Sequence, residues 1–193
     1  MIVTLCQFKG GVGKTTSAIH FAALLQAKAP TLLIDSDPNK SASLWARKGL
    51  LPFDVCLEAE APKRLMKGNY THTVIDTPAR PSSDEVESIA NGTDLLILPT
   101  TPDPLSISAL IQMAGSLPED TNYKCLITLV PPPPQKDGAD AKAALERHGY
   151  PIFQRAVRRY KAYIHAASNG HTVKGPAQND WKAIWEELSD ELG

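Results

Sequence analysis

Short apolar runs alternate with helix-like stretches along the whole chain. Apolar, β-branched runs bounded by turn residues predict buried strands at 2–7, 31–35, 71–76, 94–99 and 123–130, with a weaker strand at 53–57. Apolar residues at helical spacing predict helices after residue 13 and at 41–48, 62–67, 84–90, 105–115, 139–148, 160–168 and 180–192. Residues 152–157 are expected to be extended. Continuous apolar strands that alternate with helices are typical of an α/β fold, with a mostly parallel central sheet flanked by helices on both faces.

The composition is ordinary for a globular protein, with 42% hydrophobic and 21% charged residues among 193. We expect one domain over residues 1–193. No apolar run approaches the roughly 20 residues of a membrane span, and a strand at residue 2 leaves no room for a signal peptide, so we expect a cytoplasmic protein. Cys6, Cys56 and Cys125 lie in apolar segments without C-x-x-C spacing, which favours core positions over an iron–sulfur or zinc site.

Residues 8–16 read Phe-Lys-Gly-Gly-Val-Gly-Lys-Thr-Thr, between the first predicted strand and a helix marked by Ala18, Phe21, Ala22 and Leu25. Glycines let backbone N–H groups turn inward, and the helix N-terminus adds its dipole and free donors. This context predicts a phosphate-binding loop rather than a glycine turn that merely precedes a helix. Its candidate residues are Lys9, Gly10, Gly11, Val12, Gly13, Lys14, Thr15 and Thr16. Lys14 would reach the β- and γ-phosphates, and the Thr15 hydroxyl would ligate Mg²⁺.

The loop departs from the usual G-x-x-x-x-G-K-[ST] pattern, because Phe8 stands where the first glycine is expected and Lys9 opens the loop. Lys-Gly-Gly-Val-Gly-Lys-Thr-Thr resembles the deviant P-loop of the ParA/MinD ATPases. This resemblance implies a P-loop NTPase in which Lys9 crosses an ATP-sandwich homodimer and touches the partner's ATP. Local spacing by itself indicates only a second cation beside the phosphates.

Two further strands are predicted to end in carboxylates, Asp35 and Asp76. In a parallel sheet these ends meet the P-loop at one edge, where ligands bind. Thr-Val-Ile-Asp before Thr77 is typical of a Walker B strand, whose Asp76 can hold Mg²⁺ beside Thr15. Asp35-Ser36-Asp37-Pro38 resembles the family's D-x-D-P segment, which implies that Asp37 orients the attacking water and that Asp35 belongs to the magnesium shell. The alternative for each aspartate is a helix N-cap or turn residue.

The resemblance extends over nearly the whole chain and is most specific at 7–48 and 71–106. Residues 98–106 resemble the family's P-x-x-P-x-x-x-S segment near the dimer interface, and residues 155–157 with 168–173 resemble its C-terminal part. The chain begins at the first strand, which implies the small type without the N-terminal helix-turn-helix domain of larger plasmid ParA proteins. Leu129-Val130-Pro131-Pro132 differs from the residues that contact adenine in relatives, so the base preference is less secure than phosphate binding.

The densest basic cluster consists of Arg155, Arg158, Arg159 and Lys161. The three arginines would share a face if this stretch were helical. Small ParA proteins bind DNA nonspecifically through C-terminal basic residues, which implies such a role here; a solvated surface is the alternative. Lys174 and Lys182 are the next candidates. Because the net charge is −1, any contact with nucleic acid needs a local patch.

The last predicted helix carries an apolar stripe of Trp181, Ile184, Trp185, Leu188 and Leu192. Asp180, Glu186, Glu187, Asp190 and Glu191 would form its acidic outer face. Membrane-targeting helices need bases on that face, so this helix is expected to pack on the core.

The resemblance therefore implies an Mg²⁺-dependent ATPase in which Asp37, Lys9 and Lys14 are catalytic and Thr15, Asp35 and Asp76 surround the metal. It would form a homodimer with ATP, bind nonspecific DNA on the nucleoid, and position a cargo through a ParB-like or other adaptor that stimulates hydrolysis. The cargo could be a plasmid, a chromosome region or a protein organelle such as the carboxysome. One alternative is a MinD-like membrane-cycling ATPase, which the acidic last helix disfavours. The other is a metabolic enzyme such as dethiobiotin synthetase or a cobyrinic acid amidase, which is disfavoured because those enzymes lack a lysine equivalent to Lys9.

Overall fold

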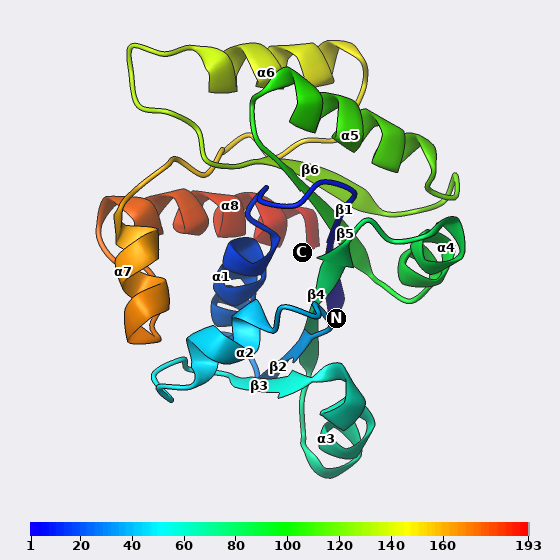
Figure 1. The fold of residues 1–193 in the computed structure, drawn as a ribbon, viewed down its shortest axis with the longest axis vertical. Helices are drawn as coiled ribbons and strands as arrows, with labels where there is room; N and C mark the ends of the chain where they lie inside the picture. Colours follow the sequence, from blue (N-terminus) through cyan, green and yellow to red (C-terminus); the bar gives the residue numbers. More distant parts are fainter. Residues whose placement is uncertain (193) are drawn as a thin grey trace.

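Six parallel strands form the central sheet of the computed structural model, which describes residues 1–192, with side chains as far as Asp190 (Figure 1). The strands are β1 (Ile2–Gln7), β2 (Thr31–Asp35), β3 (Asp54–Leu57), β4 (His72–Ala79), β5 (Leu95–Thr100) and β6 (Tyr123–Ile127). Their order is β3-β2-β4-β1-β5-β6. Every neighbouring pair is parallel, which confirms the α/β fold predicted from the apolar runs.

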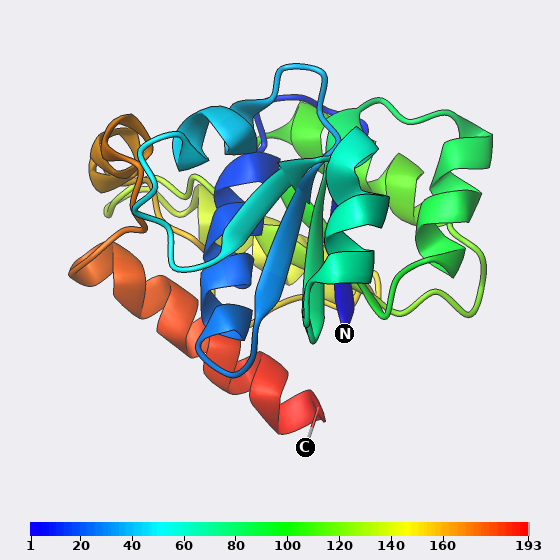
Figure 2. The ribbon, with the colours of Figure 1, turned by 90° about the horizontal axis from the view of Figure 1, so that it is seen from below.

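Helices cover both faces of the sheet, as the alternation of elements predicted. Figure 2 shows α1 and α8 on one side of the sheet and α3 and α4 on the other. The helices are α1 (Lys14–Gln26), α2 (Ser41–Ala46), α3 (Ala61–Lys67), α4 (Ser83–Asn91), α5 (Pro104–Gly115), α6 (Asp137–Arg147), α7 (Ala162–Asn169) and α8 (Pro176–Leu192). A short 3₁₀ turn, η1 (Glu58–Glu60), precedes α3.

The apolar core differs between the two faces of the sheet. On the α1 face one continuous cluster joins Leu5 and Val74 of the sheet to Phe21 of α1 and Trp181 of α8. On the other face the buried apolar residues fall into two clusters, one beneath α4, α5 and α6 and a smaller one beside α3. Burial of each large apolar side chain contributes about 1.5–3 kcal/mol, so both faces stabilise the sheet. Cys6, Cys56 and Cys125 are all buried, as their apolar surroundings predicted.

Element boundaries differ from the sequence-based expectation where long-range contacts intervene. Strand β4 continues past Asp76 to Ala79, because a register shift against β1 between Leu5 and Gln7 keeps the two strands paired. Strand β6 ends at Ile127 instead of Val130, and Leu129 has a φ of 53° that leaves the extended region. Helix α8 begins at Pro176, four residues before the predicted start at 180.

Residues 152–157 are extended, as predicted, and lie alongside β6. The amide of Phe153 donates to the Cys125 carbonyl at 3.0 Å, and the amide of Val157 donates to the Ile127 carbonyl at 2.8 Å. Because these amides are bonded to the neighbouring strand, they cannot close helical turns. The condition under which Arg155, Arg158 and Arg159 would share a helix face is therefore not met, because this stretch is not helical.

The apolar stripe of α8 packs on the core, as expected, through the buried Trp181, Ile184 and Leu188 and the partly buried Trp185. The expected acidic outer face needs one correction, since Asp180 is wholly buried beneath the chain that precedes α7. The side chains of Glu191 and Leu192 lie outside the described residues. Within the described part of the chain, no helix is long and apolar enough to cross a membrane.

Candidate functional site

The glycine-rich segment forms the turn between β1 and α1 that the sequence predicted. Gly11 and Gly13 have φ angles of 78° and 84°, a left-handed conformation that strains any residue with a Cβ atom. Gly13 is the N-cap of α1, and its carbonyl accepts the Ser17 amide at 2.9 Å. The free amides of the first helical turn therefore follow directly after the loop, an arrangement suited to an anion.

Two polar residues that the sequence analysis overlooked brace this loop. Gln7 is wholly buried. Its side-chain Nε2 donates to the Pro99 carbonyl at 3.2 Å, and its side-chain Oε1 accepts the Phe8 backbone amide at 2.8 Å. The Thr128 hydroxyl donates to the Val12 carbonyl at 2.8 Å. The sequence feature that could have predicted this bracing role is a polar residue at the carboxyl end of an otherwise apolar strand, next to the edge of the sheet where ligands bind.

A hollow of about 680 Å³ opens over the loop. Its lining includes Gly11, Gly13, Lys14, Thr15, Thr16 and Asp37. Lys14 is only 7% exposed, so its ammonium group is held within the site. The volume is in the range of pockets that enclose small molecules, and an ammonium beside helix-terminal amides suits a phosphate chain.

Asp35 and Asp76 are direct neighbours in the β2–β4 register and are both buried. One oxygen of Asp35, Oδ2, accepts the Ser43 amide at 2.7 Å and so caps α2, as the alternative interpretation of this aspartate allowed. Its Oδ1 atom and both carboxylate oxygens of Asp76 are buried without a hydrogen bond among the described residues. Burial, aided by the charge of Asp35, raises the pKa of Asp76 to about 7, while the neighbouring Thr15 hydroxyl and Lys14 oppose this rise.

These unsatisfied oxygens fit a divalent cation, because buried carboxylates otherwise need donors or counter-charges. The described residues contain no group of three or more His, Cys, Asp and Glu side chains that could hold a metal alone. A cation held by Asp35, Asp76 and Thr15 would therefore need phosphate oxygens and water as its other ligands. That is the way Mg²⁺ is usually bound with nucleotides.

Asp37 lines the same hollow but is more exposed than Asp35 and Asp76. Its Oδ1 atom accepts the Asn39 backbone amide at 2.8 Å and the Asn39 side-chain amide at 2.9 Å. Oδ2 makes no hydrogen bond to another described residue, so it is available to a water molecule at the hollow.

Lys9 lies outside the lining of this hollow and contacts the start of α5 instead. Its ammonium group donates to Asp103 Oδ1 at 3.1 Å and to Ser106 Oγ at 2.7 Å. Hydroxyl donors from Ser106 and Thr101 are the main cause of an Asp103 pKa well below its usual range, with Lys9 adding to the effect. The second cation of the loop is thus held next to the phosphate hollow without entering it.

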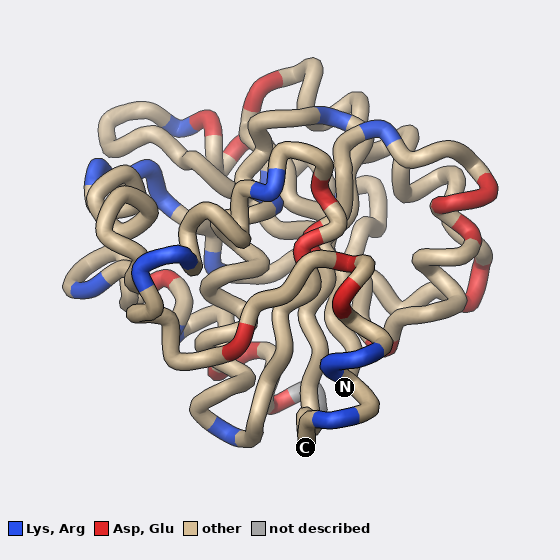
Figure 3. The backbone as a smooth tube through the Cα atoms, turned by 60° about the horizontal axis from the view of Figure 1, so that its bottom comes forward, with Lys and Arg blue, Asp and Glu red and all other residues tan. Residues whose placement is uncertain are grey.

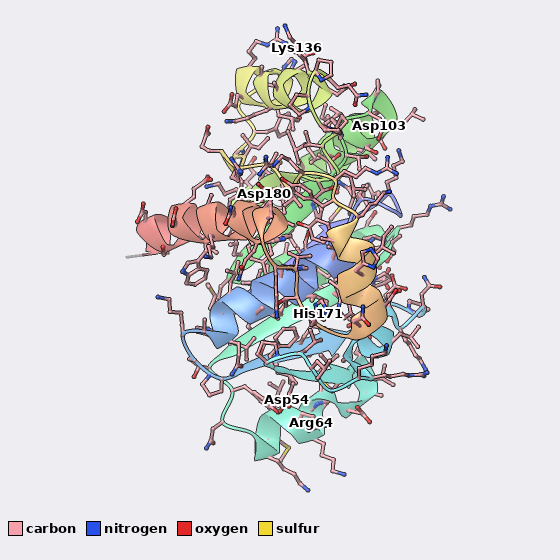
Figure 4. The ribbon with its side chains drawn as sticks, turned by 90° about the vertical axis from the view of Figure 1, so that its left-hand side faces the viewer. Asp54, Arg64, Asp103, Lys136, His171 and Asp180 are labelled. Atoms are coloured by element: carbon pink, nitrogen blue, oxygen red, sulfur yellow. The ribbon has the colours of Figure 1, made fainter. Side chains whose placement is uncertain are left out.

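The basic cluster is divided by its contacts. Asp180, which Figure 4 labels on α8, is buried and pairs with both Arg155 and Arg158, through Nη2–Oδ1 distances of 2.6 and 2.9 Å. The Arg158 amide also donates to Asp180 Oδ2 at 3.1 Å. Arg159 and Lys161 are exposed and form no comparable pair within the described residues.

A parallel sheet with a phosphate-type loop at its carboxyl edge, a buried lysine and unsatisfied aspartates defines a P-loop nucleotide-binding protein. The family follows from sequence comparison: the profile described as "CobQ/CobB/MinD/ParA nucleotide binding domain" matches residues 3–173. The chain belongs to this family.

Similar proteins cover the chain almost from end to end. Maintenance of carboxysome distribution protein A from Gloeobacter kilaueensis is 35% identical over 99% of this chain and 93% of its own length. The protein of the same name from Halothiobacillus neapolitanus is 27% identical over 89% of this chain and 85% of its own length. Among solved structures, apo McdA from Cyanothece superposes with a TM-score of 0.76 at 17% identity, covering 100% of this chain and 99% of that one.

Proposed function

We propose that this protein is an ATPase that positions a cargo, with one functional unit spanning the chain. The observation that carries the proposal is that the P-loop and Asp37 line one hollow, while the buried, unsatisfied oxygens of Asp76 lie near Thr15 and Lys14 of that loop and beside Asp35 in the sheet. ATP is supported further by a solved McdA–ATP complex from Cyanothece, which matches with a TM-score of 0.76. The two carboxysome distribution proteins cover most of this chain and of their own length, so we infer a carboxysome-like protein organelle as cargo.

Each residue has a distinct role in the proposed hydrolysis. Lys14 and the first amides of α1 bind and orient the phosphates, while Asp37 holds a water molecule in line with the terminal phosphorus. Thr15, Asp35 and Asp76 would hold Mg²⁺, whose charge would offset the charge of the phosphate oxygens. Lys9 leaves Asp103 and reaches the ATP of a second subunit, as the family resemblance implies.

The proposed cycle begins with ATP-dependent pairing of two subunits and ends when hydrolysis separates them. An adaptor on the cargo would stimulate this hydrolysis. Sedimentation velocity with ATP and Mg²⁺ tests the first step: we expect a dimer with ATP and a monomer with ADP. A protein that binds ATP and stays monomeric at every concentration contradicts the proposal.

The dimer is proposed to bind nonspecific DNA through exposed lysine and arginine side chains near α7. Lys161 precedes α7 in the chain and Lys174 follows it. Lys48, which follows α2, lies beside Gly170, the C-cap of α7. Arg159 adds a further exposed positive charge, whereas Arg155 and Arg158 mainly offset the negative charge of Asp180. Two such patches on one duplex raise avidity, so ATP can switch on DNA binding in a chain with a net charge of −1.

The DNA contact is tested by charge reversal at Lys161 and Lys174, whose side chains form no hydrogen bond or ion pair with another residue that the structure describes. We expect Lys161→Glu with Lys174→Glu to abolish ATP-dependent binding to a labelled random duplex in fluorescence anisotropy, with dimerisation intact. The matched control is the double variant Lys63→Glu with Lys67→Glu, which reverses two exposed lysines on α3 and is expected to keep DNA binding. Equal loss in both double variants would assign binding to overall charge instead of this patch.

The cargo is tested in the host cell. Deleting the gene is expected to turn evenly spaced, fluorescently labelled carboxysomes into a few clusters, and the parental gene should restore their spacing. Normal spacing in the deletion strain contradicts a carboxysome cargo while leaving the ATPase cycle untouched.

A further inference from the structure

Residues 170–175 form a short strap that connects α7 to α8. Gly170 and Gly175 at its two ends have φ angles of 75° and 65°, a left-handed conformation that favours glycine. Between them, the His171 carbonyl accepts a hydrogen bond from Nε1 of Trp45 on α2 at 3.0 Å. Figure 4 labels His171 close to the end of α7. The indole of α2 therefore fixes the strap directly after α7.

The seam between α2 and the end of α7 is too closely packed for a side chain at Gly170. A Cβ atom there would lie 2.7 Å from the Cβ atom of Lys48 and 3.1 Å from the Trp45 carbonyl oxygen. Gly149, just after α6, has a similar φ of 77°, but a Cβ atom there would meet no described atom within 4 Å. Close packing of two helices is therefore a second reason for glycine at position 170, beyond its backbone conformation.

His20 holds the same strap from α1. Its Nε2 atom accepts the Val173 amide at 3.2 Å, and its Nδ1 atom lies 2.7 Å from the carbonyl of Thr16, the last residue of the P-loop. The histidine is only 3% exposed, so water does not compete for these contacts. The strap is thus fastened to α1 and α2, the helices that follow the P-loop and the Asp35–Asp37 segment.

The strap matters because α7 forms one wall of the nucleotide hollow. The lining away from the P-loop is uncharged and mostly apolar: Leu44 and Trp45 from α2, Ala167 and Ser168 from α7, and Leu129. Such a surface suits a base and a ribose, whereas Lys14 and the helix-terminal amides suit the phosphates. Figure 3 shows basic segments grouped on the side of the molecule where α7 lies, which favours an anionic ligand there.

We propose that Trp45 is a positioning residue for the nucleotide, which acts by holding α7 against the hollow. Its indole N–H and the close packing at Gly170 keep the α2–α7 seam closed, while His20 keeps the strap in line with the P-loop. The base and ribose then meet a wall of fixed spacing, and the P-loop binds the phosphates independently of it. This inference rests on the proposed ATPase function for the identity of the ligand, whereas the fastening of α7 is testable without nucleotide.

Hydrogen exchange followed by mass spectrometry tests the fastening in the nucleotide-free protein. Trp45→Phe keeps an aromatic ring and removes the donor, so we expect the amides of residues 162–169 to exchange about fivefold faster than in the parent. Trp185→Phe makes the same change on α8, outside the hollow, and is the matched control. Equal exchange of these amides in the parent and Trp45→Phe, or an equal increase in Trp185→Phe, overturns the fastening.

Isothermal titration calorimetry with ADP and with inorganic pyrophosphate tests the role in the site; ADP leaves the protein monomeric in the proposed cycle. We expect Trp45→Phe to weaken ADP binding about fivefold or more and to change pyrophosphate binding less than about twofold, because the P-loop is untouched. Gly170→Ala, which forces the seam apart, should act in the same direction. Gly149→Ala imposes a similar backbone strain without that clash and should keep both parental affinities.

Three affinity results would overturn the positioning role. The first is an unchanged ADP affinity in Trp45→Phe, and the second is an equal weakening of ADP and pyrophosphate, which would mean that the seam does not act on the base and ribose. The third is an equal loss in Gly170→Ala and Gly149→Ala, which would assign the effect to backbone strain. If the parent binds neither ligand nor ATP while exchange in α7 responds to Trp45→Phe and not to Trp185→Phe, the proposed function fails and the fastening of α7 stands.

Discussion

The ammonium group of Lys9 lies 3.1 Å from Asp103, a residue 94 positions further along the chain at the N-cap of α5. The lysine that distinguishes this P-loop is therefore held within its own subunit, next to the hollow. Both side chains are partly exposed, so water screens the pair and its strength is modest. In the proposed dimer, Lys9 would have to leave Asp103 before it could reach the partner's ATP.

We predict that Asp103→Asn lowers the ATP concentration needed for half-maximal dimerisation by up to about fivefold, because it frees Lys9 while an asparagine still caps α5. Sedimentation velocity over an ATP series measures the midpoint. Asp94→Asn is the control, since it weakens another exposed contact, with the chain's amino group at 3.9 Å. A midpoint that stays the same or rises would show that Asp103 does not restrain Lys9.

Lys14→Ala is expected to abolish measurable ATP binding. The ammonium is nearly buried in the hollow, and its removal takes away a charge-assisted contact to the phosphates. Isothermal titration calorimetry measures the affinity. Lys9→Ala is the matched control and should retain binding by the single subunit, because Lys9 does not line the hollow. Tight ATP binding by Lys14→Ala would contradict the P-loop assignment.

Asp37→Ala is expected to bind ATP and remain a stable dimer with little hydrolysis. Among the described residues the side chain bonds to Asn39 alone, so its loss should change the free energy of unfolding by about 1 kcal/mol or less. Gel filtration with ATP and Mg²⁺, together with a phosphate-release assay, separates binding from turnover. Hydrolysis at the parental rate would exclude a catalytic role for Asp37.

Asp180→Ala is expected to lower the free energy of unfolding by about 1–3 kcal/mol. The buried carboxylate holds Arg155 and Arg158 and thereby fastens the extended segment beside β6 to α8. Half-exposed guanidinium groups can turn to water, which keeps the loss below that of a wholly buried pair. Urea denaturation measures it, and the exposed Asp190→Ala on the same helix should change stability by less than about 0.5 kcal/mol. Equal effects of the two substitutions on stability would show that the ion pairs of Asp180 with Arg155 and Arg158 do not stabilise the fold.

His20 predicts a pH dependence of stability. Its ring stacks on Trp181 with centroids 4.9 Å apart, Nδ1 lies 2.7 Å from the Thr16 carbonyl, and Nε2 lies 3.2 Å from the Val173 amide. The Nε2 contact needs an acceptor, so the neutral ring fits these partners. Burial lowers the pKa of His20 from 6.5 to about 4.

Because the unfolded chain protonates His20 at higher pH than the folded chain, this residue should reduce stability as the pH falls from about 6.5 to about 4. The reduction should reach about 3 kcal/mol and grow no further at lower pH. Denaturant unfolding across this range measures the slope. His20→Phe keeps an aromatic ring but cannot titrate, so this part of the slope should disappear; an unchanged slope would show that other groups cause it.

The sequence by itself determined the elements whose signals are local. The P-loop could be predicted because Gly13, Lys14 and Thr15 follow one another between an apolar run and a helical pattern. Asp35 and Asp76 could be placed at one edge because parallel strands bring their carboxyl ends together. The burial of the three cysteines followed from their apolar neighbours.

Only the tertiary structure decided which distant side chains meet. Nothing local links Gln7 to Pro99, Thr128 to Val12, or Lys9 to Asp103, since each contact depends on the order of strands in the sheet. The buried position of Asp180 likewise follows from helix α8 crossing the extended segment beside β6, although its charge and spacing predicted an exposed face. Hydrophobic periodicity records which side of an element is buried, whereas partners for polar groups are chosen when those buried sides come together.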